Sequence, residues 1–180
     1  MRKLITSLLL ISIYAISLAQ VSVPKKKQTD LGLYINSQNA YERWKANPEK
    51  VKILDVRTIG EYAFVGHAPM AINVPFLFLD GSYDLDGNKF NMSPNENFVK
   101  DVESRFAKTD TIFVTCRSGG RSARATNLLA KNGYKFVYSI FDGFEGDAVK
   151  DAGSYLKGKR VLNGWKNSSA PWTYELYKDK

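Results

Sequence analysis

One stretch of this 180-residue sequence decides how the chain folds: Thr111-Ile112-Phe113-Val114-Thr115-Cys116-Arg117-Ser118-Gly119-Gly120-Arg121-Ser122. Its first five residues are β-branched or aromatic, which is typical of a buried strand. Two glycines follow, and residues 121–132 then have helical spacing, with Leu128 and Leu129 directed inward and Gly133 as the expected C-cap. The stretch therefore predicts a strand, a tight loop and a helix, the unit from which parallel α/β sheets are built.

The same alternation of strands and helices continues on both sides of this stretch. We expect helices over residues 37–47 after an N-cap at Asn36 or Ser37, over a short segment capped by Thr58 and closed by Gly66, and from Pro94 through residue 106. We expect strands over residues 51–56, 71–74, 111–115 and 135–140. Residues 76–94 are rich in turn formers and are expected to form an excursion from the domain. This order predicts an α/β fold with a central parallel sheet and helices on both faces.

The composition excludes several classes of protein. A hydrophobic content of 44% indicates a globular chain. The single cysteine cannot form an intrachain disulfide, and one cysteine with one histidine cannot supply the usual cage of a structural zinc. We therefore expect no metal and no cofactor. The net charge is +8, but no motif combines stacking aromatic residues with basic ones, so we expect no nucleic-acid partner.

The N-terminus has the pattern of a secretory signal peptide. Arg2 and Lys3 precede an apolar run over residues 4–19, which is shorter than the roughly 20 residues of a membrane span. We predict a signal peptide over residues 1–19, cleaved after Ala19, with an uncleaved anchor as the alternative. Its loss would remove two cations and no acid, which lowers the net charge to +6. The prediction is an exported protein, periplasmic or secreted, without a stable membrane span after cleavage.

The exported chain then divides into three parts. Residues 20–36 are expected to form a basic, solvated leader, and residues 37–147 the folded domain. Residues 148–180 are expected to form a C-terminal tail that packs on the domain or extends it. No internal repeat or second domain is evident.

The environment predicted for Cys116 is that of a reactive thiol. Ligands bind open α/β sheets at the carboxyl ends of the strands, where this cysteine lies. The two glycines allow successive backbone amides to point inward and form an anion site. Arg117, Arg121 and Arg124 add positive charge, which favours a thiolate over a thiol. The alternative is a buried, inert cysteine beside an anion-binding loop.

Here the sequence resembles the rhodanese family of sulfurtransferases. The active loop of that family has six residues and begins with the nucleophilic cysteine, as does Cys116-Arg117-Ser118-Gly119-Gly120-Arg121. Leu54-Asp55-Val56-Arg57 and Gly66-His67 resemble the family's upstream signature, and Asp142-Gly143-Phe144 resembles its downstream one. The resemblance implies a rhodanese-like fold over most of the chain that follows the signal peptide.

The resemblance also implies a reaction and roles for individual residues. The Cys116 thiolate would take the outer sulfur of a small anionic donor such as thiosulfate and pass it from a persulfide to a thiol or cyanide acceptor. The loop of Arg117, Ser118, Gly119, Gly120 and Arg121 would bind the substrate, with the two arginines on the sulfonate. Asp55 would brace a loop arginine, Arg57 would do the same or lie on the surface, and Ser122 would support the loop.

Two alternative functions and the role of His67 remain to be considered. Phosphatases and arsenate reductases of the Cys-x5-Arg type need five residues between cysteine and arginine, whereas Cys116 and Arg121 are separated by four. A sulfur carrier or interaction module for an exported redox partner protein would form the persulfide but turn over poorly. His67 is expected to have a structural role in its turn rather than a catalytic or metal-binding one.

Overall fold

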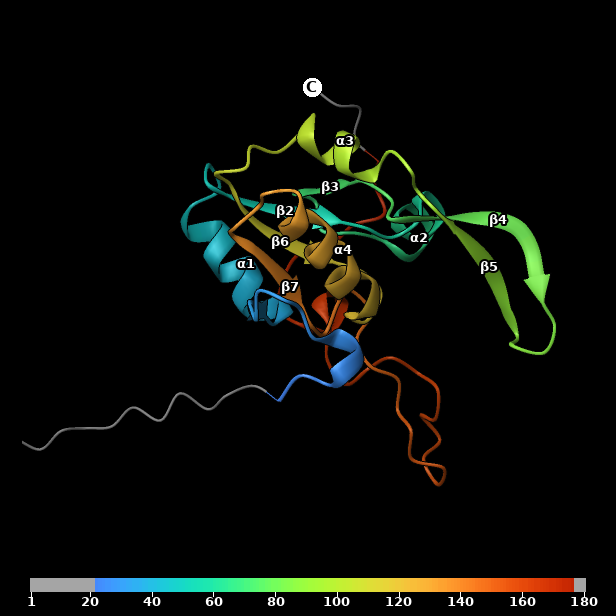
Figure 1. Cartoon of the computed structure of the whole chain (residues 1–180). Coiled ribbons are helices and arrows are strands. Elements are labelled where there is room, and N and C mark those ends of the chain that lie inside the picture. The colour runs from blue at the N-terminus through green and yellow to red at the C-terminus, as the bar shows by residue number, and fades with distance from the viewer. Residues whose placement is uncertain (1–21, 177–180) are drawn as a thin grey trace, which may run out of the picture.

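The computed structural model describes residues 22–176 (Figure 1). The predicted signal peptide over residues 1–19 lies outside the described residues, and export therefore stays a prediction. Within residues 22–176, no helix has the length and apolar character needed to cross a membrane.

A five-stranded parallel sheet forms the centre of the fold. Its strand order is β1-β7-β6-β2-β3, and every pair of neighbours is parallel. The strands are β1 (Tyr34–Ile35), β2 (Val51–Asp55), β3 (Ala71–Asn73), β6 (Thr111–Thr115) and β7 (Val137–Ile140). The helices are α1 (Ser37–Ala46), α2 (Ile59–Val65), α3 (Phe98–Glu103) and α4 (Gly120–Lys131). The predicted parallel α/β architecture is confirmed, with β1 as a strand that the sequence did not indicate.

Alternate residues of the central strands enter two cores on opposite faces of the sheet. Ile112 and Val114 of β6 pack in one core with residues of α3 and α4. Phe113, between them, packs in the other core with residues of α1 and α2. This two-residue period is the geometry of a strand with both faces buried, and it confirms that helices cover both faces.

The helix boundaries follow the predicted capping signals. The Asn36 side chain accepts a hydrogen bond from the Asn39 amide and caps α1. Thr58 and Glu61 form a reciprocal capping box at the start of α2. Helix α4 ends at Lys131, and Gly133 has the positive φ of 91° that follows such a helix end.

The predicted excursion at residues 76–94 is a β-hairpin that projects from the domain beside α2 (Figure 1). Its strands are β4 (Leu77–Asp84) and β5 (Lys89–Pro94). The prediction that Pro94 begins a helix is wrong, because Pro94 pairs with Leu77 at the end of β5. Asn95 then forms the turn that precedes α3, since its amide donates to Phe76 O and its side chain accepts from the Asn97 amide.

The prediction that residues 20–36 form a solvated leader is wrong, because β1 belongs to the central sheet and Lys27 is buried. A short 3-10 helix, η1 (Lys25–Lys27), packs against α4 and buries Lys27, whereas Lys25 and Lys26 remain exposed. The aliphatic part of Lys27 lies against Gly119, and its amine forms a 2.8 Å ion pair with Asp147. A lysine can be buried in this way because its stem is apolar and its amine finds a carboxylate.

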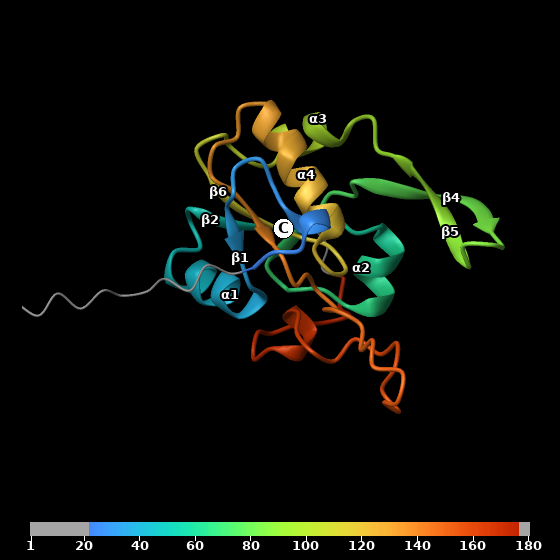
Figure 2. The ribbon, with the colours of Figure 1, turned by 60° about the horizontal axis from the view of Figure 1, so that its bottom comes forward.

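The C-terminal segment packs on the face of the sheet that carries α1 and α2 (Figure 2). A second 3-10 helix, η2 (Trp165–Asn167), buries Trp165, whose indole N–H donates to Pro171 O at 2.9 Å. His67 and Thr173 exchange two backbone hydrogen bonds of 2.8 Å in an isolated antiparallel bridge. Trp165, Ala170 and Trp172 of this segment therefore complete the second core, whereas the loop around Tyr155 is exposed to solvent.

We expect Trp165→Ala to lower the free energy of unfolding by about 3–5 kcal/mol, because it leaves a large cavity in the second core. Urea denaturation followed by circular dichroism measures the change. Tyr155→Ala is the matched control, since Tyr155 belongs to the same segment but is 89% exposed, and it should change stability by less than about 0.5 kcal/mol. Equal effects of the two substitutions would contradict the packing described here.

Candidate active site

Cys116 lies directly after β6 in a loop whose backbone is turned toward its sulfur. The thiol is buried, with Sγ 3.2 Å from the Gly119 amide that donates to it and 3.7 Å from Ser122 Oγ. Gly119 has a φ of 97°, and a Cβ at this position would lie 2.1 Å from Phe141 O. Glycine is therefore required for the amide to reach the sulfur.

A second segment, residues 142–145, supports the loop from behind. The amides of Phe144 and Glu145 donate to the carbonyls of Cys116 and Arg117 at 2.7 and 2.9 Å. Gly143 fits so closely that a Cβ would come within 2.7 Å of Cys116 O. These contacts satisfy the loop carbonyls on the side away from the sulfur.

A cavity of about 860 Å³ opens over this loop. Three parts of the chain line it: the loop residues 116–118, 120 and 121; Thr58, Gly60, Glu61 and Val65 from the region of α2; and the hairpin residues 77, 79 and 88–92. The structure thus places Cys116, Arg117, Ser118, Gly120 and Arg121 on one cavity, while their catalytic and substrate-binding roles stay predictions. Gly119 lies behind them, and Ser122 supports the loop by donating from its hydroxyl to Gly119 O at 3.0 Å.

Arg121 is held by an acidic residue that was not predicted for the site. Its guanidinium donates to both carboxylate oxygens of Glu61, at 2.6 and 2.5 Å. Burial alone would raise the pKa of Glu61, but the hydrogen bond and charge of Arg121, together with the hydrogen bonds from Thr58, outweigh burial and lower that pKa. Burial alone would likewise lower the pKa of Arg121, but the hydrogen bond and charge of Glu61 act in the opposite direction, and the pKa is raised. Direct donor binding by Arg121 stays a prediction, because the guanidinium already has a partner within the protein.

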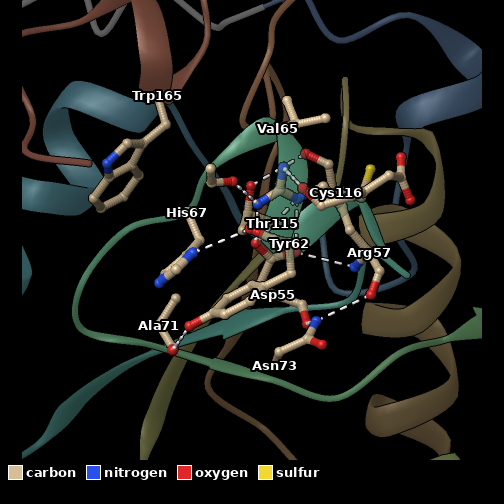
Figure 3. Close-up of polar contacts among 12 residues, drawn as sticks. Asp55, Arg57, Tyr62, Val65, His67, Ala71, Asn73, Thr115, Cys116 and Trp165 are labelled. Carbon is tan, nitrogen blue, oxygen red and sulfur yellow. Dashed lines mark hydrogen bonds and ion pairs between the residues drawn. The ribbon is translucent and has the colours of Figure 1, made fainter. Parts of the chain in front are cut away.

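Asp55 and Arg57 form a buried pair with each other (Figure 3). Their closest contact is 2.6 Å, and both side chains are fully buried. The prediction that Asp55 braces a loop arginine is wrong, because Arg57, two residues beyond the end of β2, donates to both oxygens of Asp55. A surface role for Arg57 is also wrong. The guanidinium lies 4.0 Å from the centre of the Phe144 ring and so packs against the segment behind the loop.

His67 has the structural role that was predicted for it (Figure 3). The side chain is buried, its Nδ1 lies 3.1 Å from Tyr62 O, and its ring stacks on that of Tyr62 at 3.7 Å. Among residues 22–176, no cluster of three or more His, Cys, Asp or Glu residues could hold a metal ion.

The family model of the rhodanese-like domain matches residues 37–148. The chain belongs to the rhodanese-like family. Residues 37–148 of this rhodanese-like chain include the sheet from β2 to β7, the loop at Cys116 and the supporting segment behind it.

Similar proteins agree with this assignment. The chain is 41% identical over 93 residues to thiosulfate sulfurtransferase 16, chloroplastic, of Arabidopsis thaliana, a match that covers 52% of this chain and 70% of that protein. It is 35% identical over 125 residues to protein RP600 of Rickettsia prowazekii, covering 68% and 82%. The crystal structure of Rv0390 from M. tuberculosis superposes with a TM-score of 0.62 at 28% identity, covering 78% of this chain and 96% of that one. The predicted rhodanese-like fold is confirmed.

We expect Glu61→Gln to destabilise the protein in a pH-dependent way. Because the pKa of Glu61 is lowered in the folded state, its carboxylate stabilises the fold above its ordinary value of 4.5, and that stabilisation is lost as the pH falls through the lowered pKa. Urea denaturation should show a loss of about 1.5–3 kcal/mol at neutral pH that shrinks in acid. Glu103→Gln is the control, since its 3.1 Å pair with Lys108 is exposed. A loss that is independent of pH would contradict the role of the ion pair.

Proposed function

We propose that this member of the rhodanese-like family is a thiosulfate sulfurtransferase that carries sulfur on Cys116. The observation that carries the proposal is the position of Cys116 Sγ, which accepts the Gly119 N–H at 3.2 Å in a cavity that the exposed Arg117 also lines. A related protein is named a thiosulfate sulfurtransferase, and this supports the same reaction for the present chain.

In the first step, the Cys116 thiolate attacks the outer sulfur of thiosulfate. A bond forms between Sγ and that sulfur, the sulfur–sulfur bond of thiosulfate breaks, and its electron pair leaves with sulfite. The persulfide that remains on Cys116 carries one negative charge on its outer sulfur. Backbone N–H groups of the loop would stabilise that charge as they stabilise an oxyanion in acyl transfer.

Some residues around Cys116 would bind the donor, and others would hold the loop in position. Arg117 is exposed on the cavity, and its guanidinium would bind the sulfonate oxygens of the donor by charge-assisted hydrogen bonds. Arg121, whose charge is balanced by Glu61, would position the start of α4 beside the sulfur. Asp55 and Arg57 would act further back, through the contact of Arg57 with Phe144.

A sulfur carrier for an exported redox partner is the second candidate. It would form the same persulfide. The carrier and the sulfurtransferase would therefore differ only in how fast the persulfide reacts with an acceptor. The open cavity of about 860 Å³ favours turnover, because an acceptor has room to approach Cys116. Phosphatase chemistry is disfavoured by the short loop and by the pairing of Arg121 with Glu61, which leaves that arginine committed.

We expect Cys116→Ser to abolish sulfur transfer. Mass spectrometry of the wild-type protein after thiosulfate treatment should show one added sulfur atom on Cys116, and cyanide should then release thiocyanate. The variant should show neither, since it lacks the nucleophile. Wild-type protein that gains no sulfur would contradict the proposal, and hydrolysis of an aryl phosphate would favour the phosphatase alternative. Persulfide without thiocyanate would favour the carrier.

We expect Arg117→Met to lower kcat/KM for thiosulfate about ten- to a hundredfold, because it removes charge-assisted hydrogen bonds worth about 1.5–3 kcal/mol. Steady-state kinetics with cyanide as acceptor measures the change. Arg105→Met is the matched control, because Arg105 is an exposed arginine after α3 that bonds to Asp101 O. If both substitutions had the same effect, Arg117 would not be a donor ligand.

A further inference from the structure

The β4–β5 hairpin gathers its apolar side chains on one face. Leu79 pairs with Met92, and Tyr83 pairs with Phe90 across the hairpin. Paired residues of neighbouring strands point to the same side, and so do residues two apart in one strand. Since Phe90 and Met92 are two apart in β5, all four side chains belong to one face.

This apolar face is turned toward Cys116. Leu79, Phe90 and Met92 line the same cavity as Cys116 and Arg117, with Leu77 at the base of the hairpin. Leu79 is 50% exposed and Phe90 is 57% exposed, so the face remains open to a bound molecule. On the opposite face Phe78 pairs with Ser93, and Lys89 and Asn91 alternate with Phe90 and Met92 in β5, although these two polar residues also border the cavity. The opposite face is therefore more polar.

The proposed donor makes no use of this surface. Thiosulfate is a small dianion without apolar atoms, and the loop and Arg117 suffice to bind it. Cyanide is smaller still. Pockets that bind small organic molecules have volumes of about 300–1,000 Å³ and combine apolar walls with a few polar groups. The volume of this cavity, about 860 Å³, lies within that range.

The charges on the cavity favour an anionic occupant. Arg117 is exposed on one side, and Lys89 of the hairpin is exposed on another, with only a long 3.6 Å contact to Asp84. The single acidic residue among the described lining residues, Glu61, is neutralised by Arg121. The hairpin thus contributes apolar side chains to a cavity that polar residues such as Thr58, Asn91 and Ser118 also line, and the charge that remains is positive.

We propose that the apolar face of the hairpin is the acceptor subsite and that the acceptor is a small organic thiol with an apolar body and an anionic group. This assignment rests on the proposed sulfurtransferase function and names the acceptor class. The acceptor thiolate attacks the outer sulfur of the Cys116 persulfide. A new sulfur–sulfur bond forms on the acceptor, the bond to Sγ breaks, and its electron pair returns to Cys116 as the thiolate.

The test uses the full folded protein loaded with thiosulfate and freed of excess donor. Mercaptooctanoate, mercaptopropionate, mercaptooctanol or cyanide is then added, and loss of the persulfide is followed by mass spectrometry in single-turnover experiments. We expect the second-order rate constant, corrected for thiolate fraction, to be about tenfold or more higher for mercaptooctanoate than for mercaptopropionate, because the longer chain buries more apolar surface. Mercaptooctanol should react more slowly than mercaptooctanoate because it lacks the carboxylate.

The hairpin variants locate the preference. Phe90→Ser combined with Met92→Gln should reduce the rate constant for mercaptooctanoate about tenfold and leave loading by thiosulfate and reaction with cyanide within twofold. Phe78→Ser, on the opposite face, is the matched control and should leave all rate constants within twofold. Thermal unfolding checks that the variants fold as the wild type does.

Failures of the two proposals are distinguishable. A protein that never acquires sulfur from thiosulfate contradicts the proposed function. Two results would overturn the acceptor assignment alone in a protein that loads sulfur. One is an equal rate constant for mercaptooctanoate and mercaptopropionate. The other is an equal effect of the Phe90→Ser/Met92→Gln and Phe78→Ser substitutions on the rate constant for mercaptooctanoate. If reduced ribonuclease, used as a protein thiol, accepts sulfur in a hairpin-dependent way while the small thiols do not, the face is a protein-docking surface and the assignment is wrong.

Discussion

The close backbone contact between the loop at Cys116 and the segment behind it is the constraint on which the site depends. Gly143 occupies a space that no side chain can share, and the amides of Phe144 and Glu145 bind the loop carbonyls. With its carbonyls held on that side, the loop can turn the Gly119 amide toward the sulfur. The anion-binding character of the loop is therefore a product of glycine geometry as much as of arginine charge.

Several segments that are far apart in the sequence meet behind the loop at Cys116. Lys27 packs against Gly119 from the N-terminal side and pairs with Asp147. Asp142 accepts hydrogen bonds from Ser37 at the start of α1 and from the Gly164 amide. Burial raises the pKa of Asp142, although these hydrogen bonds act in the opposite direction. Segments far apart in sequence thus fix the position of the loop jointly.

Features set by local interactions were predictable from the sequence. The alternation of β-branched residues located β2 and β6, and the spacing of Thr58 and Glu61 located the start of α2. The single cysteine among glycines and arginines indicated the candidate site. In each case the signal lies within a few residues of the feature, so it does not depend on the tertiary fold.

Features set by distant partners were not predictable. Lys27 belongs to a run of three lysines that is typical of a solvated segment, and its burial depends on two distant partners, Gly119 and Asp147, the latter 120 residues away. Glu61 was predictable as a capping residue, but its ion pair with Arg121 spans 60 residues. The pairing of Asp55 with Arg57 had a local signal, since carboxylate and guanidinium are two residues apart, yet the choice between this partner and a loop arginine depends on the packing of Phe144.

The pairing of the hairpin bears on how the cavity of this chain can change. Strands β4 and β5 form a sheet with each other and are separate from the central sheet in strand order. Their base is closed where Leu77 meets Pro94 and the Asn95 amide binds Phe76 O. Residues beyond that closure can therefore change in length and sequence without altering the register of the central strands. The hairpin is a module in which selection can remodel the cavity wall while the geometry around Cys116 is inherited unchanged.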